Sequence, residues 1–241
     1  YIFDRSMAFE MKNFTKLTDL RKDRLWRIEK SEDIWYAADV NGQKFAIERA
    51  EGEELCHGDV IELTQKGKVI RLHDGSSSSA LVYVTNQCNS NCIMCPDSVK
   101  ARTRSNPVTY EYLMEYISLL PSDLMHVDIT GGEPTLLKYK LQPLIRHMTE
   151  QAEEAEVLML SNGRSFADRK YAAEFAGFSD KRFKIEIPIH SAQEDRHDLI
   201  AGRPGSFVQT KAGLHHLLAY GVKVGIRIVV SRLNYMELNS I

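Results

Sequence analysis

The sequence lacks several features that would assign it to a common class of protein. No apolar run approaches the roughly 20 residues that a helix needs to cross a bilayer, and no signal peptide is visible. The 31 Lys and Arg residues are balanced by 33 Asp and Glu residues, so there is no basic excess for binding nucleic acid. Only four cysteines are present, and nothing indicates a disulfide-bonded secreted protein. We therefore predict a cytoplasmic protein with no membrane or nucleic-acid partner.

Three of the four cysteines lie within eight residues, at Cys88, Cys92 and Cys95, in a polar loop after the strand-type run 81–85. Thiolates are soft ligands that select iron–sulfur clusters, zinc or Cu(I), and three thiolates on a four-iron cluster would leave one iron open. Structural zinc needs four closed ligands, so a fourth would have to come from Cys56, far upstream. The motif favours an iron–sulfur cluster, and zinc stays open as the alternative.

The rest of the pattern changes character near residue 78. Residues 1–78 hold short β-type runs separated by turns, which predict a small antiparallel sheet or barrel. Gly75 and the four serines after it predict a flexible linker. The β-type runs are 25–28, 34–40, 44–48, 60–64 and 69–73, with turns at 41–42, 58–59 and 66–68.

After the linker, strand and helix patterns alternate, which predicts a parallel sheet with right-handed crossovers. The predicted strands are 81–86, 126–130, 157–161, 183–190 and 222–230, and the predicted helices are 109–120, 138–153, 167–176 and 206–220. We therefore predict an α/β protein, with a small β-rich domain at 1–78 and a partial α/β barrel at 79–241.

Polar or glycine-rich residues follow four of the predicted strands. They are the three cysteines, then Gly131-Gly132-Glu133-Pro134, Ser161-Asn162-Gly163 and His190-Ser191. In parallel α/β barrels the active site gathers at the carboxyl ends of the strands, so we expect these residues to form one site. Paired glycines allow a close backbone approach, and Glu133 adds an acceptor. Taken singly, these stretches are also compatible with ordinary turns, and the two histidines with a structural role.

Together, C-x3-C-x2-C after one strand and G-G-E-P after the next resemble the radical S-adenosylmethionine superfamily, over about residues 80–235. The resemblance implies a partial (βα)6 barrel and a [4Fe–4S] cluster on Cys88, Cys92 and Cys95. It also implies S-adenosylmethionine on the open iron, cleaved to a 5′-deoxyadenosyl radical by an electron from a donor such as flavodoxin or ferredoxin. A sixth strand would lie beyond Ile241, and both ends of the sequence look cut.

The resemblance further implies which residues bind S-adenosylmethionine. The backbone of the G-G-E-P stretch would hold the ammonium group, and Ser161 and Asn162 would contact the ribose and methionine parts. Ser191 would help to bind the carboxylate, and the backbone of the strand containing Ile226 would meet the adenine. The full set of expected cofactor-binding residues is Met94, Gly131, Gly132, Glu133, Pro134, Ser161, Asn162, Ser191, Arg203 and Ile226.

Two positions depart from the family pattern. Met94 stands where an aromatic residue near the adenine is usual, although a thioether can still give a soft apolar contact. Ala201 stands before Gly202 where relatives often carry an arginine. A basic group for the carboxylate would then come from Arg203, Arg196 or Arg227, and Arg203 is the residue that we predict.

A closer resemblance concerns the substrate. The stretches TNQCNSNCIMC, ITGGEPTLL, LSNGRSF and IPIHSAQEDRHDLI are similar to the radical S-adenosylmethionine maturases of His-Xaa-Ser systems. This resemblance implies a ribosomally made peptide substrate of the His-Xaa-Ser type. From the short β-type runs and the serine linker we predict that the N-terminal module folds separately and helps to present that peptide. Two alternatives stay open: a radical enzyme for a small molecule or nucleotide, as in deazapurine or cofactor synthesis, and a non-catalytic, zinc-stabilised binding protein. The N-terminal module could equally be a cap that only packs on the catalytic domain.

Overall fold

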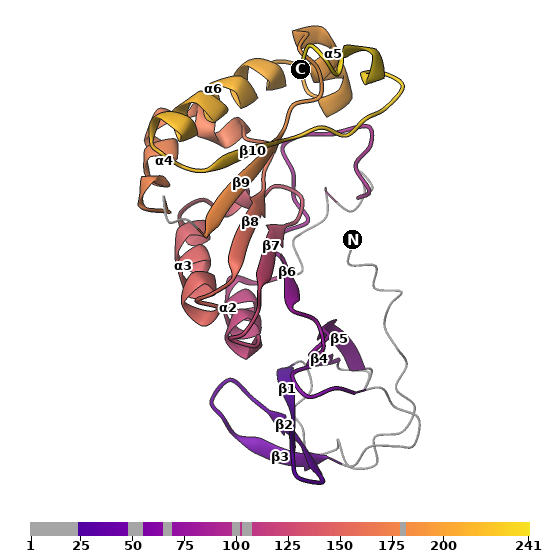
Figure 1. Ribbon diagram of the computed structural model, residues 1–241, viewed down its shortest axis with the longest axis vertical. Helices are drawn as coiled ribbons and strands as arrows, with labels where there is room; N and C mark the ends of the chain where they lie inside the picture. Colours follow the sequence, from indigo (N-terminus) through magenta and orange to yellow (C-terminus); the bar gives the residue numbers. More distant parts are fainter. Residues whose placement is uncertain (1–23, 48–54, 65–68, 98–101, 103–107, 179–181) are drawn as a thin grey trace. The chain divides into compact units, whose positions relative to one another are not determined.

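The computed structural model describes residues 24–47, 55–64, 69–97, 102, 108–178 and 182–241 (Figure 1). The chain divides into two compact units. The first takes its described residues from the ranges 1–81, 109–126 and 144–155, and the second takes them from 82–108, 127–143 and 156–241. The predicted turn at 66–68 and the stretch before Arg24 lie outside the described residues.

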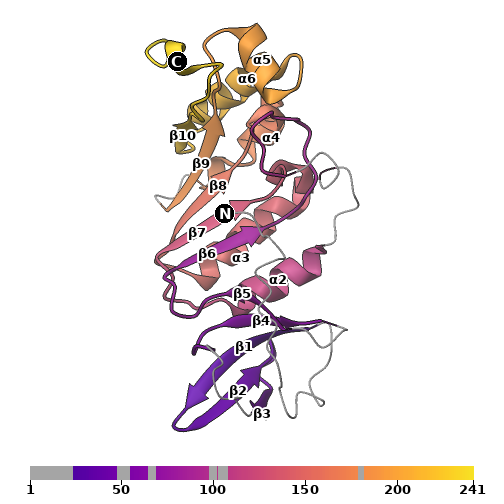
Figure 2. The ribbon, with the colours of Figure 1, turned by 90° about the vertical axis from the view of Figure 1, so that its right-hand side faces the viewer.

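The first unit is built on a five-stranded antiparallel sheet with the order β3-β2-β1-β4-β5. Its strands are β1 (Arg24–Ser31), β2 (Ile34–Ala38), β3 (Lys44–Ile47), β4 (Val60–Leu63) and β5 (Val69–His73). Figure 2 shows β1, β2 and β3 as one meander. Trp26 and Ile28 are buried in its core, and the ring of Phe45 meets Trp26 edge-on at 5.5 Å. The antiparallel N-terminal sheet that the sequence predicts is confirmed.

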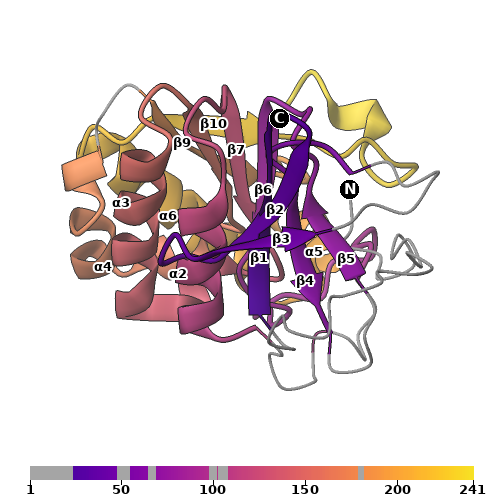
Figure 3. The same ribbon diagram turned by 90° about the horizontal axis from the view of Figure 1, so that it is seen from below.

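Two helices from later in the chain complete the first unit: α2 (Tyr110–Leu119) and most of α3 (Leu141–Gln151). They lie side by side in Figure 3. The two helices are joined by a contact of 2.8 Å between Ser118 Oγ and His147 Nε2. The Thr109 side chain caps α2 by accepting a hydrogen bond from the Tyr112 backbone N–H, which agrees with the predicted helix start. The Tyr112 hydroxyl donates to Glu62 of β4, and that of Tyr116 to the Leu72 carbonyl, so α2 contacts the antiparallel sheet.

A second, five-stranded sheet has the order β10-β9-β8-β7-β6, which follows the chain, and most of it belongs to the second unit. The strands are β6 (Ser79–Tyr83), β7 (His126–Thr130), β8 (Glu156–Leu160), β9 (Phe183–Pro188) and β10 (Val224–Arg227). β8, β9 and β10 pair in parallel (Figure 1). Alternate residues of β7, β8 and β9 are almost fully buried, as expected for a sheet with a packed face. The predicted α/β class with a parallel sheet is confirmed.

The connections of the second unit differ in detail from the predictions. The expected helix 138–153 is a 3-10 segment, η3 (Pro134–Lys140), followed by α3, because Lys138 has a non-helical φ of 53°. The expected helix 167–176 consists of η4 (Arg164–Ala167), α4 (Arg169–Ala173) and η5 (Ala176–Phe178). The remaining helices are α5 (Glu194–Ala201), α6 (Ser206–Ala219) and η6 (Tyr235–Glu237). The sequence did not predict α5.

Residues 75–79, predicted as a flexible linker, form a hydrogen-bonded turn that leads into β6. The Asp74 carboxylate accepts hydrogen bonds from the Ser76 backbone N–H and hydroxyl, and Ser79 already belongs to β6. A Cβ on Gly75 would lie 2.2 Å from the His57 carbonyl oxygen, so the backbone here is tightly packed. The division at residue 78 stays a prediction. None of the described helices combines the length and apolar character that a membrane span requires.

Candidate functional site

The three motif cysteines lie in one irregular segment, Thr85–Asp97, which we call the cysteine loop. All three thiols are free and partly exposed. Thiolates around one zinc ion, each about 2.3 Å from it, would lie about 3.8 Å apart. Among the described residues, the groups whose ligand atoms all lie within 4.8 Å of one another do not include these three sulfurs. At least one pair of these sulfurs is therefore more than 4.8 Å apart.

The electrostatics of the thiols support a cationic group between them. Burial and, after it, the neighbouring thiolates of Cys88 and Cys95 raise the pKa of the Cys92 thiol to about 11. Burial also raises the pKa of Cys88, although the Ser90 backbone N–H donates to its sulfur at 3.4 Å. A bound metal cluster deprotonates its thiol ligands and offsets this repulsion. The residues present therefore fit an iron–sulfur cluster.

The glycines after β7 pack directly against the backbone of the cysteine loop. The Gly132 N–H donates to the Thr85 carbonyl at 2.6 Å, and the Glu133 N–H to the Gln87 carbonyl at 2.8 Å. Gly131 has a φ of +146°, and a Cβ there would lie 2.4 Å from the Thr85 oxygen. A Cβ on Gly132 would lie 2.1 Å from the Gln87 oxygen. Both positions therefore require glycine for contact with the loop, in addition to the cofactor role that the sequence predicts.

Glu133 is 1% exposed, and both of its carboxylate oxygens are used inside the protein. Oε1 accepts from the Thr135 N–H at 3.0 Å, the Thr135 hydroxyl at 2.6 Å and the Ser161 hydroxyl at 2.8 Å. Oε2 accepts from the Asn162 N–H at 2.7 Å. Burial raises the pKa of Glu133, and these four donors oppose the shift. Glu133 therefore joins the ends of β7 and β8, and Pro134, also buried, begins η3 behind it.

The segment after β8 reaches the cysteine loop through two side chains. The Asn162 amide donates to the Asn89 side-chain oxygen at 2.6 Å. Arg164 donates to the Asn89 carbonyl and, at 3.1 Å, to the Ser90 hydroxyl. The sequence predicted Asn162 but missed Arg164, although Arg164 directly follows the Ser-Asn-Gly stretch.

On its other side the cysteine loop is held by the end of α5. The Asn91 N–H donates to the Ala201 carbonyl and the Ile93 N–H to the Ile200 carbonyl, each at 3.0 Å. Gly202 ends α5 with a φ of +59°, and a Cβ there would lie 2.1 Å from the Asn91 oxygen. The carbonyls at a helix C-terminus have no partner within the helix, so they are available to the loop.

The three candidate arginines differ in their surroundings. Arg196 forms an ion pair with Glu237, and Arg227 pairs with Glu186 at 2.6 Å. No ion pair is found for the exposed Arg203 within the described part of the chain. Burial lowers the pKa of Arg164, and the positive charge of Arg203 lowers it further, so two cations are near each other beside the loop.

The remaining predicted residues have mixed surroundings. Met94 is half-buried in the turn between Cys92 and Cys95. Ile226 lies in β10 with its side chain 47% exposed. Ser191 is fully buried, and its hydroxyl donates to Glu237 at 2.5 Å.

The two histidines near the end of β9 are buried. His190 and His197 are 3% and 2% exposed, and their ring centroids are 5.2 Å apart. Burial and the neighbouring His197 lower the pKa of His190 to about 4, so it is neutral at pH 7. His197 Nδ1 is 3.2 Å from the Ser206 hydroxyl, which in turn donates to Asp198 at 2.7 Å. This placement fits a structural role for both.

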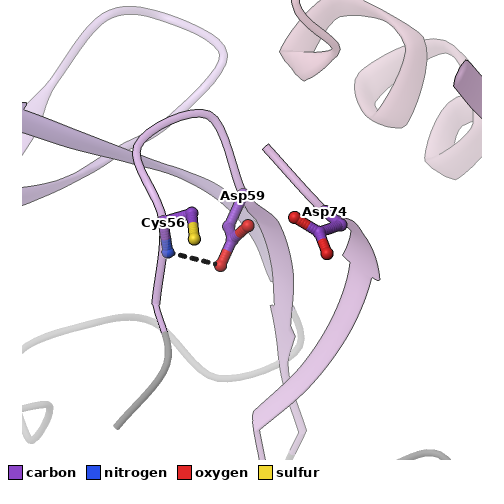
Figure 4. A group of neighbouring side chains, drawn as sticks. All are labelled: Cys56, Asp59 and Asp74. Atoms are coloured by element: carbon purple, nitrogen blue, oxygen red, sulfur yellow. Dashed lines mark hydrogen bonds between the residues drawn. The ribbon is translucent and has the colours of Figure 1, made fainter. Parts of the chain in front are cut away.

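The fourth cysteine, Cys56, belongs to the first unit and lies with Asp59 and Asp74 (Figure 4). Their ligand atoms all lie within 4.8 Å of one another. The Asp59 carboxylate already accepts from the Cys56 N–H at 2.9 Å and the Gly75 N–H at 2.7 Å, and Arg71 approaches it to 3.6 Å. The group therefore fixes a turn.

A sequence model of the radical SAM superfamily matches residues 82–240, which is well over half of the chain. Together with the parallel sheet and the cysteine loop at its strand ends, this match shows that the chain belongs to the radical SAM superfamily. Membership implies a [4Fe–4S] cluster and S-adenosylmethionine as cofactors.

Curated relatives have different functions. The chain is 27% identical over 161 residues to the Fe-coproporphyrin III synthase of Methanosarcina barkeri, covering 66% of this chain and 38% of that protein. It is 21% identical over 207 residues to AlbA of Bacillus subtilis, the antilisterial bacteriocin subtilosin biosynthesis protein, covering 80% of this chain and 45% of that protein. The chain thus spans less than half the length of both relatives.

A solved structure supports the fold. The chain resembles anSMEcpe with bound AdoMet with a TM-score of 0.51 and 15% identity, over 67% of this chain and 46% of that one. At this identity the likeness shows a shared radical SAM fold. It agrees with the predicted partial barrel as far as the five described strands extend.

Proposed function

We propose that this chain is the radical SAM part of an enzyme that modifies a ribosomally made peptide, and that Cys88, Cys92 and Cys95 hold its [4Fe–4S] cluster. The main support is the direct packing of the cysteine loop on Gly131 and Gly132, which brings the two motifs into one site. When bound, the cluster and S-adenosylmethionine supply a 5′-deoxyadenosyl radical. The residues around them orient the cofactor and exclude water.

The proposed S-adenosylmethionine contacts are those predicted from the sequence, except that Glu133 and Ser191 are given different roles. The backbone of Gly131 and Gly132 would bind the ammonium group. Glu133 would hold these glycines in place through its buried hydrogen bonds to the segment after β8. At the ribose end of S-adenosylmethionine we propose Ser161 and Asn162. At the adenine end we propose Met94 and Ile226. Arg203 is the best placed of the three arginines for the methionine carboxylate, because the other two have ion-pair partners. Ser191 is less well suited to that carboxylate than predicted, because its hydroxyl already donates to Glu237.

A peptide substrate is supported by the similarity to AlbA, a bacteriocin biosynthesis protein. The His-Xaa-Ser type is a finer proposal that rests on the sequence stretches quoted above. We also propose a cytoplasmic location with a flavodoxin or ferredoxin as electron donor, because exposed thiols and an open iron require a reducing environment. The second candidate substrate is a tetrapyrrole, which the similarity to Fe-coproporphyrin III synthase favours.

The cluster assignment is tested by anaerobic reconstitution followed by iron and sulfide analysis. We expect about four iron atoms per chain, and loss of iron and brown colour in Cys88→Ala, Cys92→Ala or Cys95→Ala. Cys56→Ala is the matched control and should keep the cluster, because Cys56 lies in the turn of the first unit. Zinc in place of iron, or full iron content in Cys92→Ala, would contradict the assignment.

The substrate class is tested by offering two candidates to the reconstituted protein with S-adenosylmethionine and dithionite. One is a peptide with repeated His-Xaa-Ser units, and the other is an iron tetrapyrrole precursor. Mass analysis of each substrate, beside measured 5′-deoxyadenosine, should show modification of the peptide only. Modification of the tetrapyrrole alone would move the function to the second candidate.

A further inference from the structure

We propose that Arg164 is a positioning residue that fixes the Cys88 end of the cysteine loop and places a positive charge beside the cluster. This inference rests on the cluster assignment proposed above. It adds a residue outside both sequence motifs, and it concerns the cluster's reduction potential as well as its geometry.

The first step is the geometry of the guanidinium group. Arg164 is the first residue of η4, directly after Gly163, which has a φ of +78° and turns the chain back towards the loop. Its Nη1 donates to the Asn89 carbonyl and to the Ser90 hydroxyl, the two residues that follow Cys88. Its Nε donates to Gln209 of α6 at 2.8 Å. One side chain therefore links the loop to the helix α6.

The second step is that arginine suits this task better than other residues. A guanidinium presents its donors in a rigid planar fork, so it can satisfy two acceptors in the loop and a third on a helix at once. Asn162 reinforces it, because its amide donates to the Asn89 side chain at 2.6 Å. Asn89 is thus held at its carbonyl by one residue and at its side chain by the other. A lysine would keep the charge but lose the fork.

The third step is the charge. The Cys88 thiolate and the Glu133 carboxylate both favour the charged form of Arg164, which places the guanidinium within electrostatic reach of the cluster ligands. Of the other charged groups nearby, Glu133 and Asp198 are occupied by hydrogen bonds from the protein, and Arg203 is a second cation. The reduction potential of an iron–sulfur cluster depends on the net charge and hydrogen bonds around it. A fixed positive charge stabilises the reduced form, which carries one more electron.

The test is an anaerobic redox titration of reconstituted protein, followed by the EPR signal of the reduced cluster. Arg164→Gln removes the charge, and Arg164→Lys keeps the charge without the fork. The matched control is Arg169→Gln, an exposed arginine of α4 whose Nε donates to the Tyr220 hydroxyl at 3.2 Å. We expect Arg164→Gln to lower the equilibrium constant for reduction of the cluster by about tenfold, which lowers the reduction potential by about 59 mV for a one-electron couple. Arg164→Lys should restore most of the potential but bind less iron than wild type.

Each outcome bears on the inference. Wild-type potential and iron content in Arg164→Gln would overturn it, and so would an equal change in Arg169→Gln. If Arg164→Gln stays folded by circular dichroism but binds no iron, while Arg164→Lys binds some, the positioning role is supported. If neither variant binds iron although both remain folded, positioning through the fork is likewise supported. If the wild-type protein binds no iron, the proposed cluster fails, and that result is distinct from all the others.

Discussion

The cysteine loop is held differently on its two sides. At the ends of β7 and β8, both main chain and side chains hold it. The N–H groups of Gly132 and Glu133 donate to carbonyls of the loop, and the side chains of Asn162 and Arg164 donate to Asn89. At the end of α5 the contacts run from main chain to main chain, from the N–H groups of Asn91 and Ile93 to helix carbonyls. The strand side therefore depends partly on which side chains are present, whereas the helix side depends on where the backbone runs. The residues of the strand side form the G-G-E-P and Ser-Asn-Gly stretches, which can be recognised in the sequence.

The largest expected effect comes from adding one methyl group on either side of the loop. Gly132→Ala would place a Cβ 2.1 Å from the Gln87 carbonyl oxygen, and Gly202→Ala would place one 2.1 Å from that of Asn91. Because backbone atoms cannot yield cheaply, we expect both variants to displace the loop and lose most of their iron after reconstitution. Gly221→Ala is the matched control for Gly202, because Gly221 has a φ of +74° but open space around it. Full iron content in Gly202→Ala would show that α5 does not hold the loop.

The next largest effect concerns the strand side of the loop, where the buried carboxylate of Glu133 is removed. Glu133→Ala leaves four donors without an acceptor, and we expect the free energy of unfolding to fall by about 4 kcal/mol. Glu133→Gln leaves one donor facing an NH2 group and should cost about 2 kcal/mol. Denaturant unfolding of the apoprotein measures both. Glu174→Gln, an exposed residue that accepts from Gln142 at 2.9 Å, should change the value by less than about 0.5 kcal/mol. A similar small change in Glu133→Ala would remove Glu133 from the support of the site.

Acid should lower the stability of the protein on the helix side of the loop, through His190. This histidine has a pKa of about 4 in the folded protein and about 6.5 when unfolded, so the unfolded state binds more protons between these values. The stability is therefore fully present above pH 6.5 and decreases as the pH falls towards 4, by about 2 kcal/mol at pH 5. Unfolding curves at pH 7 and pH 5 should show a smaller difference for His190→Gln than for wild type. His215→Gln, on the exposed face of α6, is the control and should leave the difference unchanged.

The smallest effect separates the arginines. Arg203→Gln should weaken S-adenosylmethionine binding by about tenfold, or about 1.4 kcal/mol, because it removes the positive charge that pairs with the methionine carboxylate. Arg227→Gln should have little effect, because Arg227 is paired with Glu186. Equilibrium binding to the reconstituted protein under nitrogen measures both. A larger loss in Arg227→Gln would reverse the assignment.

The sequence predicted the elements that carry strong local signals. Strand 126–130 has the predicted bounds, and α6 ends one residue before its predicted end, because buried alternation and a terminal glycine are local features. α5 escaped prediction because half of its eight residues are charged and they have little amphipathic pattern. Arg164 escaped because arginine after a turn is ordinary on a protein surface. Its role depends on Asn89, 75 residues away, which only the fold brings into contact.

The hydrogen bonds of the cysteine loop also bear on engineering. The spacer between Cys88 and Cys92 consists of Asn89, Ser90 and Asn91, and all three are bound by other parts of the fold. These three residues therefore anchor the loop to the rest of the fold, in addition to setting the distance between the two cysteines. Transplanting the C-x3-C-x2-C stretch alone into a foreign scaffold would leave these contacts without partners. A working graft would need the turn after β8 and the glycine-ended helix along with the cysteines.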